Sequence, residues 1–457
     1  MLYKQIYRVL FLVTLSIAVS HAVAGNITPE AARGIATHFV KQHNALGFKA
    51  TSMTDLQLVH AEASKTVKNA SDYYAFNIKG GGFIIIAGED RATQVLGYSD
   101  KGRLDFNNLP CGLKTLLDCY KQDIEFLQTC KDSDLMPAPN LNRDSTGVEP
   151  LLKTTWGQGP PYNWQCPMSE GELCIVGCAA TAMAQVMNYW QFPESSDSIA
   201  SYYCSAIGQD IPALPPTTFD YSLILNSYCH RDLESYELIQ DIYTDAQAQE
   251  VAKLSRYCGQ AVQMGYTPQG SSAYVDDMLE AMIAFGFTSA EYQAKPATWF
   301  IFDYTEEWEA RLRTELDAGR PIIYCARDIF VDTGHGFICD GYNSEGKFHF
   351  NFGWYGVCDG WYVSTALDLI PREGVERYYN YSHEIIAGIV PPVPVSTVTG
   401  DVNNDGEVNI SDVTLYINYL LNDDATDFLI ANADFNEDGE ANISDVIDMI
   451  NYLLNNV

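Results

Sequence analysis

A cysteine at the start of an alanine-rich segment is the strongest chemical signal in this sequence. Residues 177–187 read Gly-Cys-Ala-Ala-Thr-Ala-Met-Ala-Gln-Val-Met, and Ala180, Met183 and Met187 recur at helical spacing. Cys178 is therefore expected in the first turn of a helix, where unpaired backbone N–H groups and the helix dipole favour a thiolate. Such a thiolate, with N–H donors aimed at a developing oxyanion, suits nucleophilic catalysis. The alternative is a structural cysteine in a core helix.

A nucleophilic thiol needs a general base beside it, and the central part of the chain holds four histidines: His230, His335, His349 and His383. His335 lies between two glycines at the start of an apolar segment, so its backbone is open to a ligand. Asn351 begins the motif Asn-Phe-Gly-Trp, and its amide is suited to hold an imidazole while aromatic rings shield it. His349 alternates with phenylalanines and is expected on the other face of its strand. Any one of these histidines, taken alone, is more often structural.

A second oxyanion donor is predicted upstream of the cysteine. Gln158 ends the motif Thr-Trp-Gly-Gln and precedes the loop 159–163. A glutamine amide is a suitable donor to an oxyanion. The alternative is a solvated loop glutamine.

Length, charge and cysteine count bound the kind of protein. A chain of 457 residues predicts two to four domains, and its formal net charge of −32 argues against nucleic-acid or anionic-membrane partners. Residues 1–24 read as a signal peptide: basic residues precede a short apolar run, and Ala-Val-Ala follows it. That run is too short to span a membrane, and no later segment is apolar enough. We therefore expect a secreted protein that is extracellular or held at the cell surface through its C-terminal module.

Export places the 12 cysteines in an oxidising setting, where disulfides form. Nine of them lie between residues 166 and 358. An odd number predicts that pairing leaves one thiol free, and Cys178 is the natural candidate. The alternative is that several are buried thiols.

The first unit after the signal peptide is predicted to be α+β and to span 25–147. Its patterns indicate helices at 27–43 and 113–130, strands at 73–78 and 83–87, and a turn-rich, protease-accessible passage at 136–147. It is either a propeptide or an additional α+β domain.

The largest unit is predicted to span 148–390. Helices are expected from Cys178 and at 246–264, 273–284 and 308–318, followed by strands at 321–325, 336–342, 347–352, 360–364 and 384–390. This order indicates a helical part packed on an antiparallel sheet, with the cysteine and a histidine meeting between them.

Several motifs in this unit together resemble the streptopain family of papain-like cysteine peptidases. They are Trp156-Gly-Gln158, Pro161-Tyr162-Asn163, the segment 177–187, Gly334-His335, Asp340-Gly341 and Asn351-Phe-Gly353-Trp354, and the segment 74–99 is similar to that family's propeptide. The resemblance implies a zymogen with an inhibitory propeptide, a Cys178 nucleophile, a His335 base and a Gln158 oxyanion donor. It also implies that Ser271, Ser272, Gly334 and Trp354 lie near the substrate. The family does not depend on disulfides, and it is often treated as a Cys-His dyad with tryptophan support, which leaves Asn351 less secure as the orienting residue.

A proline-rich linker at 391–399 leads to a duplicated segment at 400–457, in which Asp434 follows Asp401 by 33 residues. The repeats resemble dockerin-type calcium loops, with oxygen ligands at positions 1, 3, 5, 9 and 12 and a carbonyl at position 7. The implied Ca²⁺ ligands are Asp401, Asn403, Asp405, the Glu407 carbonyl, Asn409 and Asp412, then Asp434, Asn436, Asp438, the Glu440 carbonyl, Asn442 and Asp445. Each loop leads into an apolar helix, which predicts a small all-α module. The family implies a cohesin-type partner; the alternative is a calcium-stabilised cap.

The leading hypothesis is a secreted cysteine endopeptidase, made as a zymogen, that acts on protein or peptide substrates without a catalytic cofactor. A catalytically silent assembly or adhesion protein that docks through the calcium module is the second. It is disfavoured because Cys178, His335 and Gln158 are all intact. A carbohydrate-active enzyme is the third, but the central unit offers no ordered pair of acidic residues.

Overall fold

The computed structural model describes residues 25–43, 47–48, 52–137, 146–295, 305–328, 333–367, 369–372, 381–392, 398–422 and 428–455. The predicted signal peptide and most of the predicted 136–147 passage lie outside these residues. The chain divides into two compact units, Met1–Pro391 and Pro392–Val457. Within the described residues, no helix has the length and apolar character needed to cross a membrane.

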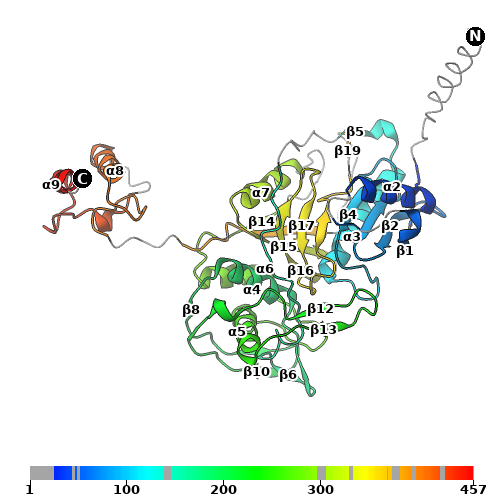
Figure 1. Cartoon of the computed structure of the whole chain (residues 1–457), viewed down its shortest axis with the longest axis horizontal. Coiled ribbons are helices and arrows are strands. Elements are labelled where there is room, and N and C mark those ends of the chain that lie inside the picture. The colour runs from blue at the N-terminus through cyan, green and yellow to red at the C-terminus, as the bar shows by residue number, and fades with distance from the viewer. Residues whose placement is uncertain are drawn as a thin grey trace, which may run out of the picture. The chain divides into compact units, whose positions relative to one another are not determined.

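A single ten-stranded antiparallel sheet organises the first unit (Figure 1). In spatial order its strands are β1 (Leu56–Ala63), β2 (Ser71–Ile78), β3 (Phe83–Ala87), β4 (Val95–Ser99), β18 (Gly360–Tyr362), β17 (Phe348–Asn351), β16 (Thr333–Tyr342), β15 (Ile322–Asp328), β20 (Tyr381–Ala387) and β14 (Glu291–Ala294). The first four strands belong to the predicted propeptide. They join the rest where Trp361 and Tyr362 of β18 pair with Tyr98 and Gly97 of β4.

Six helices of the first unit lie within the described residues. They are α2 (Pro29–Gln42), α3 (Cys111–Thr129), α4 (Cys178–Trp190), α5 (Asp245–Ala261), α6 (Val275–Ala284) and α7 (Thr305–Asp317). Short strands form two-stranded hairpins or ribbons around them: β5 (Leu135–Pro137) with β19 (Leu369–Pro371), β6 (Met168–Ser169) with β7 (Glu172–Leu173), β8 (Ser195–Ser196) with β11 (Thr217–Thr218), β9 (Tyr202–Cys204) with β10 (Gln209–Ile211), and β12 (Cys229–Arg231) with β13 (Leu238–Gln240).

The two faces of the sheet carry different helices, because successive strand residues point to opposite sides. On one face, Ile323, Cys325 and Ile338 share a core with α4, α5 and α6. We call this the α4 face. On the other, Tyr324, Phe337 and Cys339 share a core with α3 and α7, the α3 face. Helix α2 covers the strands β1–β4 on the side away from α3.

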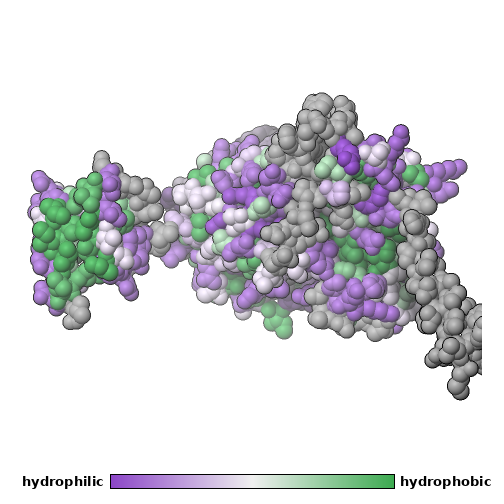
Figure 2. Space-filling view, turned by 90° about the horizontal axis from the view of Figure 1, so that it is seen from above, coloured by the Kyte–Doolittle hydropathy of each residue, from purple (hydrophilic) through white to green (hydrophobic). Residues whose placement is uncertain are grey.

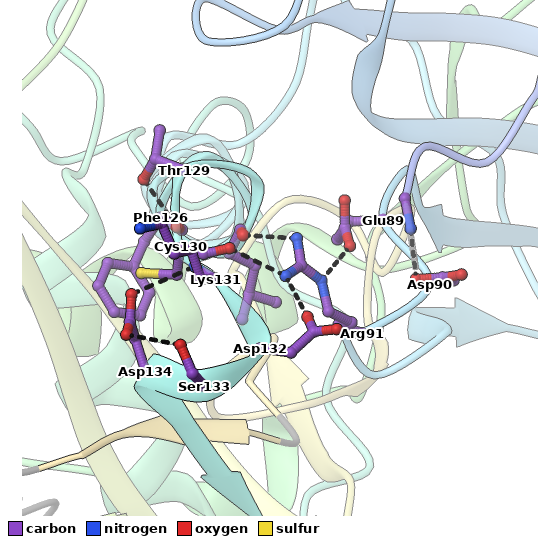
Figure 3. A network of polar contacts seen from close by, with 12 residues as sticks. Glu89, Asp90, Arg91, Phe126, Thr129, Cys130, Lys131, Asp132, Ser133 and Asp134 are labelled. Atoms are coloured by element: carbon purple, nitrogen blue, oxygen red, sulfur yellow. Dashed lines mark hydrogen bonds and ion pairs between the residues drawn. The ribbon is translucent and has the colours of Figure 1, made fainter. Parts of the chain in front are cut away.

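Helix α3 is fixed at its C-terminal end by Arg91, which follows β3 (Figure 3). The guanidinium donates to the Leu127 carbonyl at 2.6 Å and the Cys130 carbonyl at 3.1 Å, which are acceptors left open at a helix end. It also pairs with Glu89 at 2.6 Å and Asp132 at 3.0 Å. The helix that crosses the α3 face is thereby tied to the predicted propeptide's own strands.

The second unit consists of two loop–helix segments around a small core. Helices α8 (Ile410–Asn422) and α9 (Ile443–Asn455) contribute Val413, Tyr416, Val446 and Met449 to that core. Short 3₁₀ turns complete the described elements: Met53–Asp55, Asp132–Asp134, Tyr221–Leu223 and Ile430–Asn432. Figure 2 shows apolar side chains gathered on one side of this unit.

The predicted α+β class is confirmed, and the expected helices and strands are present with bounds shifted by a few residues. The disulfides predicted from export are not formed: none of the twelve cysteines, all within the described residues, is in a disulfide. Eight of them are buried, so the buried-thiol alternative describes this structure. The parity argument that singled out Cys178 therefore has no structural basis.

Candidate active site

Cys178 is the first residue of α4, as its sequence context predicts. The residue before it, Gly177, has a φ of +90°, a left-handed conformation that favours glycine. A Cβ at this position would lie 2.9 Å from Met264 Sδ and 3.0 Å from the Ser271 carbonyl oxygen. A side chain here would displace its neighbours, so the glycine lets the chain enter the helix with the thiol at its N-terminus.

The thiol opens into a pocket of about 600 Å³. Its walls include Cys178, Ser272, Met278, Cys325, His335 and Glu384, from α4, α6 and three adjacent strands. The pocket thus collects the predicted nucleophile and the predicted base in one place, with both apolar and charged walls.

Burial raises the pKa of the Cys178 thiol above its usual value, and the backbone N–H groups of Gly336 and Ala179 oppose that rise. The backbone N–H groups therefore lower the pKa of the Cys178 thiol, as expected, but desolvation raises it by more. Gly336 lies beside the start of α4: a Cβ there would be in ordinary van der Waals contact with Ala179 Cα, at 3.6 Å. Desolvation therefore favours the thiol form of Cys178 in this arrangement.

His335 borders the pocket, but its strand register directs its side chain toward the α3 face. It pairs across the sheet with Ala326, which lies in the core of the α3 face, whereas its neighbour Gly336 pairs with Cys325 on the α4 face. Among the described contacts, no hydrogen bond joins the Cys178 sulfur to the imidazole. Burial, aided by the positive charge of Lys114 on α3, lowers the pKa of His335 to about 4. A neutral imidazole on the α3 face cannot take the thiol proton without turning toward Cys178.

Gln158 lies beside the segment that leads to Cys178. It is buried, and its carbonyl accepts the Val176 N–H at 3.0 Å, two residues before Cys178. The next residue, Gly159, donates its N–H to the Tyr355 hydroxyl at 3.1 Å. The described residues that line the pocket do not include Gln158.

Among the hydrogen bonds of the described residues, none joins the Asn351 side chain to a histidine. Its amide donates to the Thr154 carbonyl at 2.7 Å and exchanges contacts of 3.3 Å with the Gln185 amide. His349 instead pairs with Asp340 at 2.6 Å on the buried side of the sheet, a structural ion pair. The sequence interpretation did not single out Gln185. The pattern that could have indicated it is one amide side chain on an otherwise apolar face of the helix.

The predicted substrate residues lie in different environments. Ser272 lines the pocket and is exposed, whereas the Ser271 hydroxyl is buried and donates to the Ile175 carbonyl at 2.7 Å. Gly334 of β16, next to His335, pairs with Arg327 of β15. Trp354 is half-buried against the core of the α3 face.

The loops of the C-terminal unit have the arrangement expected of a cation site. Asp401, Asp405 and Asp412 place carboxylate oxygens within 4.8 Å of one another, the only such group among the described residues. Asp401 and Asp412 are fully buried. Residues 400–457 contain no Lys or Arg that would offset these charges, so the donor set fits a divalent cation with oxygen ligands.

The second loop repeats the same backbone contacts. Asp401 accepts the N–H groups of Asp405 and Gly406, and Asp434 accepts those of Asp438 and Gly439. The twelfth residues match as well: Asp412 accepts the Asn409 N–H at 2.9 Å, and Asp445 accepts the Asn442 N–H at 2.8 Å. The two loops are thus structural copies.

Comparison with known proteins finds three family matches along the chain. A Spi protease inhibitor family matches residues 24–124, the Peptidase C10 family matches 156–362, and the dockerin type I domain matches 399–454. Streptopain from Streptococcus pyogenes is 26% identical over 384 residues, which cover 79% of this chain and 91% of streptopain. The thiol protease/hemagglutinin PrtT from Porphyromonas gingivalis is 26% identical over 427 residues, covering 87% of this chain and 46% of that protein.

A solved structure is similar enough to this chain to show its family. A fragment of prointerpain A from Prevotella intermedia is 30% identical, with a TM-score of 0.57, over 74% of this chain and 99% of the fragment. The streptopain-type resemblance and the fold class expected from it are confirmed. The chain belongs to the Peptidase C10 family and is a cysteine peptidase.

Proposed function

We propose that this chain is a secreted cysteine endopeptidase made as a zymogen, with Cys178 as nucleophile and His335 as general base. The observation that carries the proposal is the placement of Cys178 at the N-terminus of α4, in a pocket whose wall also contains His335. A thiol at a helix N-terminus and an imidazole on the adjacent strand are the two groups that acyl transfer through sulfur requires.

The reaction follows from these groups. His335 takes the Cys178 proton as the sulfur attacks the scissile carbonyl, and the Cys178 N–H and the Gln158 amide donate to the oxyanion. The amine leaves with the proton from the imidazolium. Water, activated by the same imidazole, then hydrolyses the thioester and restores the thiol.

The pro-segment, residues 25–147, inhibits by holding His335 on the α3 face. Helix α3 packs directly on β16: a Cβ at Gly112 would lie 2.7 Å from the ring of Phe337, two residues from His335. Burial of His335, with the positive charge of Lys114 one turn into α3, keeps the pKa of the imidazole low. Release of α3 frees the imidazole to turn toward the thiol and raises its pKa toward the ordinary value.

Ser271, Ser272, Gly334 and Trp354 contribute the walls along which the substrate backbone lies. Ser272 does so from the pocket itself, and Gly334 leaves the backbone beside His335 open. Because Ser271 is committed to the Ile175 carbonyl, it acts by shaping the loop.

The C-terminal unit binds two Ca²⁺ ions and attaches the enzyme to a cohesin-type partner at the cell surface or in the extracellular medium. Its loops supply the oxygen donors described above. Apolar side chains exposed on its two helices supply a docking face: Ile417, Leu420, Leu421, Ile447, Ile450 and Leu454. A stable cap without a partner is the alternative, and pull-down with an immobilised cohesin module distinguishes the two.

N-terminal sequencing of the secreted protein, combined with casein hydrolysis, tests the proposal. Secreted protein should first begin near residue 25 and be nearly inactive, and activity should appear as a second N-terminus near residue 148 accumulates. Full activity in protein that still begins near residue 25 overturns the zymogen assignment.

A further inference from the structure

We propose that Gln185 is a positioning residue for peptide-bond hydrolysis, acting through Asn351 and Thr154. The inference rests on the proposed function, since it assigns how the catalytic groups are held. It gives the Asn351 amide a different task from orienting an imidazole.

Three buried polar side chains form a closed ring of hydrogen bonds. The Thr154 hydroxyl donates to Gln185 Oε1 at 2.7 Å, Gln185 Nε2 donates to Asn351 Oδ1 at 3.3 Å, and Asn351 Nδ2 donates to the Thr154 carbonyl at 2.7 Å. Asn351 Nδ2 also approaches Gln185 Oε1 at 3.3 Å. Their exposed fractions are 4%, 0% and 3%, so no water replaces a lost partner.

Each corner of the ring belongs to a segment that carries a proposed active-site group. Gln185 lies two helical turns from Cys178 on α4, and therefore on the same side of the helix. Thr154 precedes Gln158 by four residues in an extended segment without regular secondary structure. Asn351 ends β17 and leads into the loop of Trp354.

The loop after β17 is pressed onto α4 at the same place. Asn351 Oδ1 accepts the Gly353 N–H at 3.0 Å. Gly353 has a φ of +62°, and a Cβ there would lie 3.0 Å from Thr181 Cγ2 of α4. The tryptophan loop, the nucleophile helix and the oxyanion segment therefore share one set of buried contacts, and shifting Gln185 moves them relative to one another.

The decisive variant is Gln185→Met in the processed enzyme, which keeps the side-chain length and removes the polar atoms. We expect kcat on casein-derived peptides to fall by about 10²-fold, the effect of displacing reacting groups by about 1 Å, with KM within about threefold of the unmodified enzyme. Tyr189→Phe is the matched control, because it removes a different hydrogen bond of the same helix, the 2.9 Å bond to the Gly319 carbonyl. It should leave kcat within about twofold.

A double-mutant cycle separates positioning from general loss of structure. Thr154→Val removes one bond of the ring with little change in volume, and we expect a fall in kcat of about tenfold. Combined with Gln185→Met it should add almost nothing, because both changes open the same ring. Independent effects that multiply in full contradict the ring as a unit.

Two failures are distinguishable. Hydrolysis that survives Cys178→Ala overturns the proposed function itself. If Cys178→Ala is inactive while a folded Gln185→Met enzyme keeps kcat within threefold of the unmodified enzyme, the positioning inference alone is wrong. Should Gln185→Met fail to fold, Thr154→Val decides, and an unchanged kcat in that variant overturns the inference.

Discussion

Helices α3 and α4 pack on opposite faces of the same strand, and a glycine lies in each contact. On the α4 face the glycine belongs to the strand: Gly336 of β16 lies beside Ala179, at a distance that would also admit a Cβ. On the α3 face it belongs to the helix: Gly112 of α3 lies against the ring of Phe337. Strand β16 thus meets α4 at a position without a side chain, and it meets α3 of the pro-segment through the Phe337 ring.

The difference explains the state of the site. Because side chains alternate along β16, position 336 lies on the α4 face and positions 335 and 337 lie on the α3 face. The register that brings Gly336 beside α4 therefore directs His335 toward the pro-segment. In the proposed mechanism, the α4 contact serves the chemistry and the α3 contact only keeps the unprocessed chain inactive.

The largest effect is expected from the two proposed catalytic groups themselves. Cys178→Ala and His335→Ala in processed enzyme should each lower kcat/KM by at least about 10³-fold, because members of one catalytic unit are not replaceable singly. Casein hydrolysis and a thermal melt check this, the melt showing that the fold persists. Activity within tenfold of the unmodified enzyme in either variant contradicts the dyad.

Loosening the α3 contact should have the opposite sign. Gly112→Val places a side chain into the Phe337 ring, and such overpacking costs about 1–3 kcal/mol. We expect the unprocessed chain to gain casein activity by about fivefold or more, since the inhibited arrangement is weakened by that free energy.

Asp118→Val is the control for that gain. It adds the same β-branched residue to an exposed position of the same helix. It should leave the unprocessed chain as inactive as before. Equal activation by both variants would show that α3 acts through its general stability, not through the contact with β16.

Low pH should destabilise the packing on the α3 face more than the packing on the α4 face. His383 is buried between α3 and the sheet, with its Nε2 3.6 Å from the Cys119 sulfur and its Nδ1 2.8 Å from the Tyr324 hydroxyl. Burial, with the charge of Lys295, lowers the pKa of His383 to about 3. The unfolded chain binds a proton below about pH 6.5 and the folded chain does not, so the free energy of unfolding falls as pH drops from about 6.5 toward 3.

Urea unfolding of the unprocessed chain at pH 7 and pH 5 measures this. His383→Gln keeps a polar partner for Tyr324 but cannot titrate, so its loss of stability over that interval should be smaller by about 1–2 kcal/mol. His335, whose pKa is also lowered, supplies part of the remaining loss. An identical pH dependence in the two proteins contradicts the assignment.

Removing calcium should change neither face of the sheet. In the C-terminal unit, chelator or the pair Asp401→Ala and Asp434→Ala should abolish helicity in residues 398–455, because the metal supplies folding free energy to a small core. Casein activity should stay within about twofold. Asp448→Ala, an exposed acid outside the loops, is the control and should leave the calcium response unchanged. Helicity that persists in excess chelator contradicts the calcium assignment.

Local patterns predicted much of this molecule. The start of α4 at Cys178 followed from alanine content and periodicity, and the calcium loops followed from repeated oxygen ligands at fixed spacing. What depends on contacts distant in sequence was missed. The pairing of β18 with β4 joins the pro-segment and the peptidase in one sheet. No periodic pattern in the sequence indicates this pairing.

The face of a strand on which a histidine lies also depends on contacts between residues that are distant in sequence. The sequence placed His335 at the start of a strand, but only the register with Ala326 and the packing of α3 decide which face it occupies. Asn351 was expected beside the imidazole by spacing along the chain; a buried amide partner, Gln185, sits within reach instead. The odd cysteine count misled because burial, not pairing, accounts for most of these thiols.

The most direct test of the account follows alkylation of Cys178 and casein hydrolysis in parallel, before and after the pro-segment is cut. Peptide mass spectrometry resolves this thiol from the other eleven. We predict that after cutting, Cys178 reacts with iodoacetamide at least about tenfold faster than before, because the freed imidazole stabilises the thiolate, and that activity falls in step with its modification. Casein hydrolysis that persists when Cys178 is fully alkylated would contradict the account.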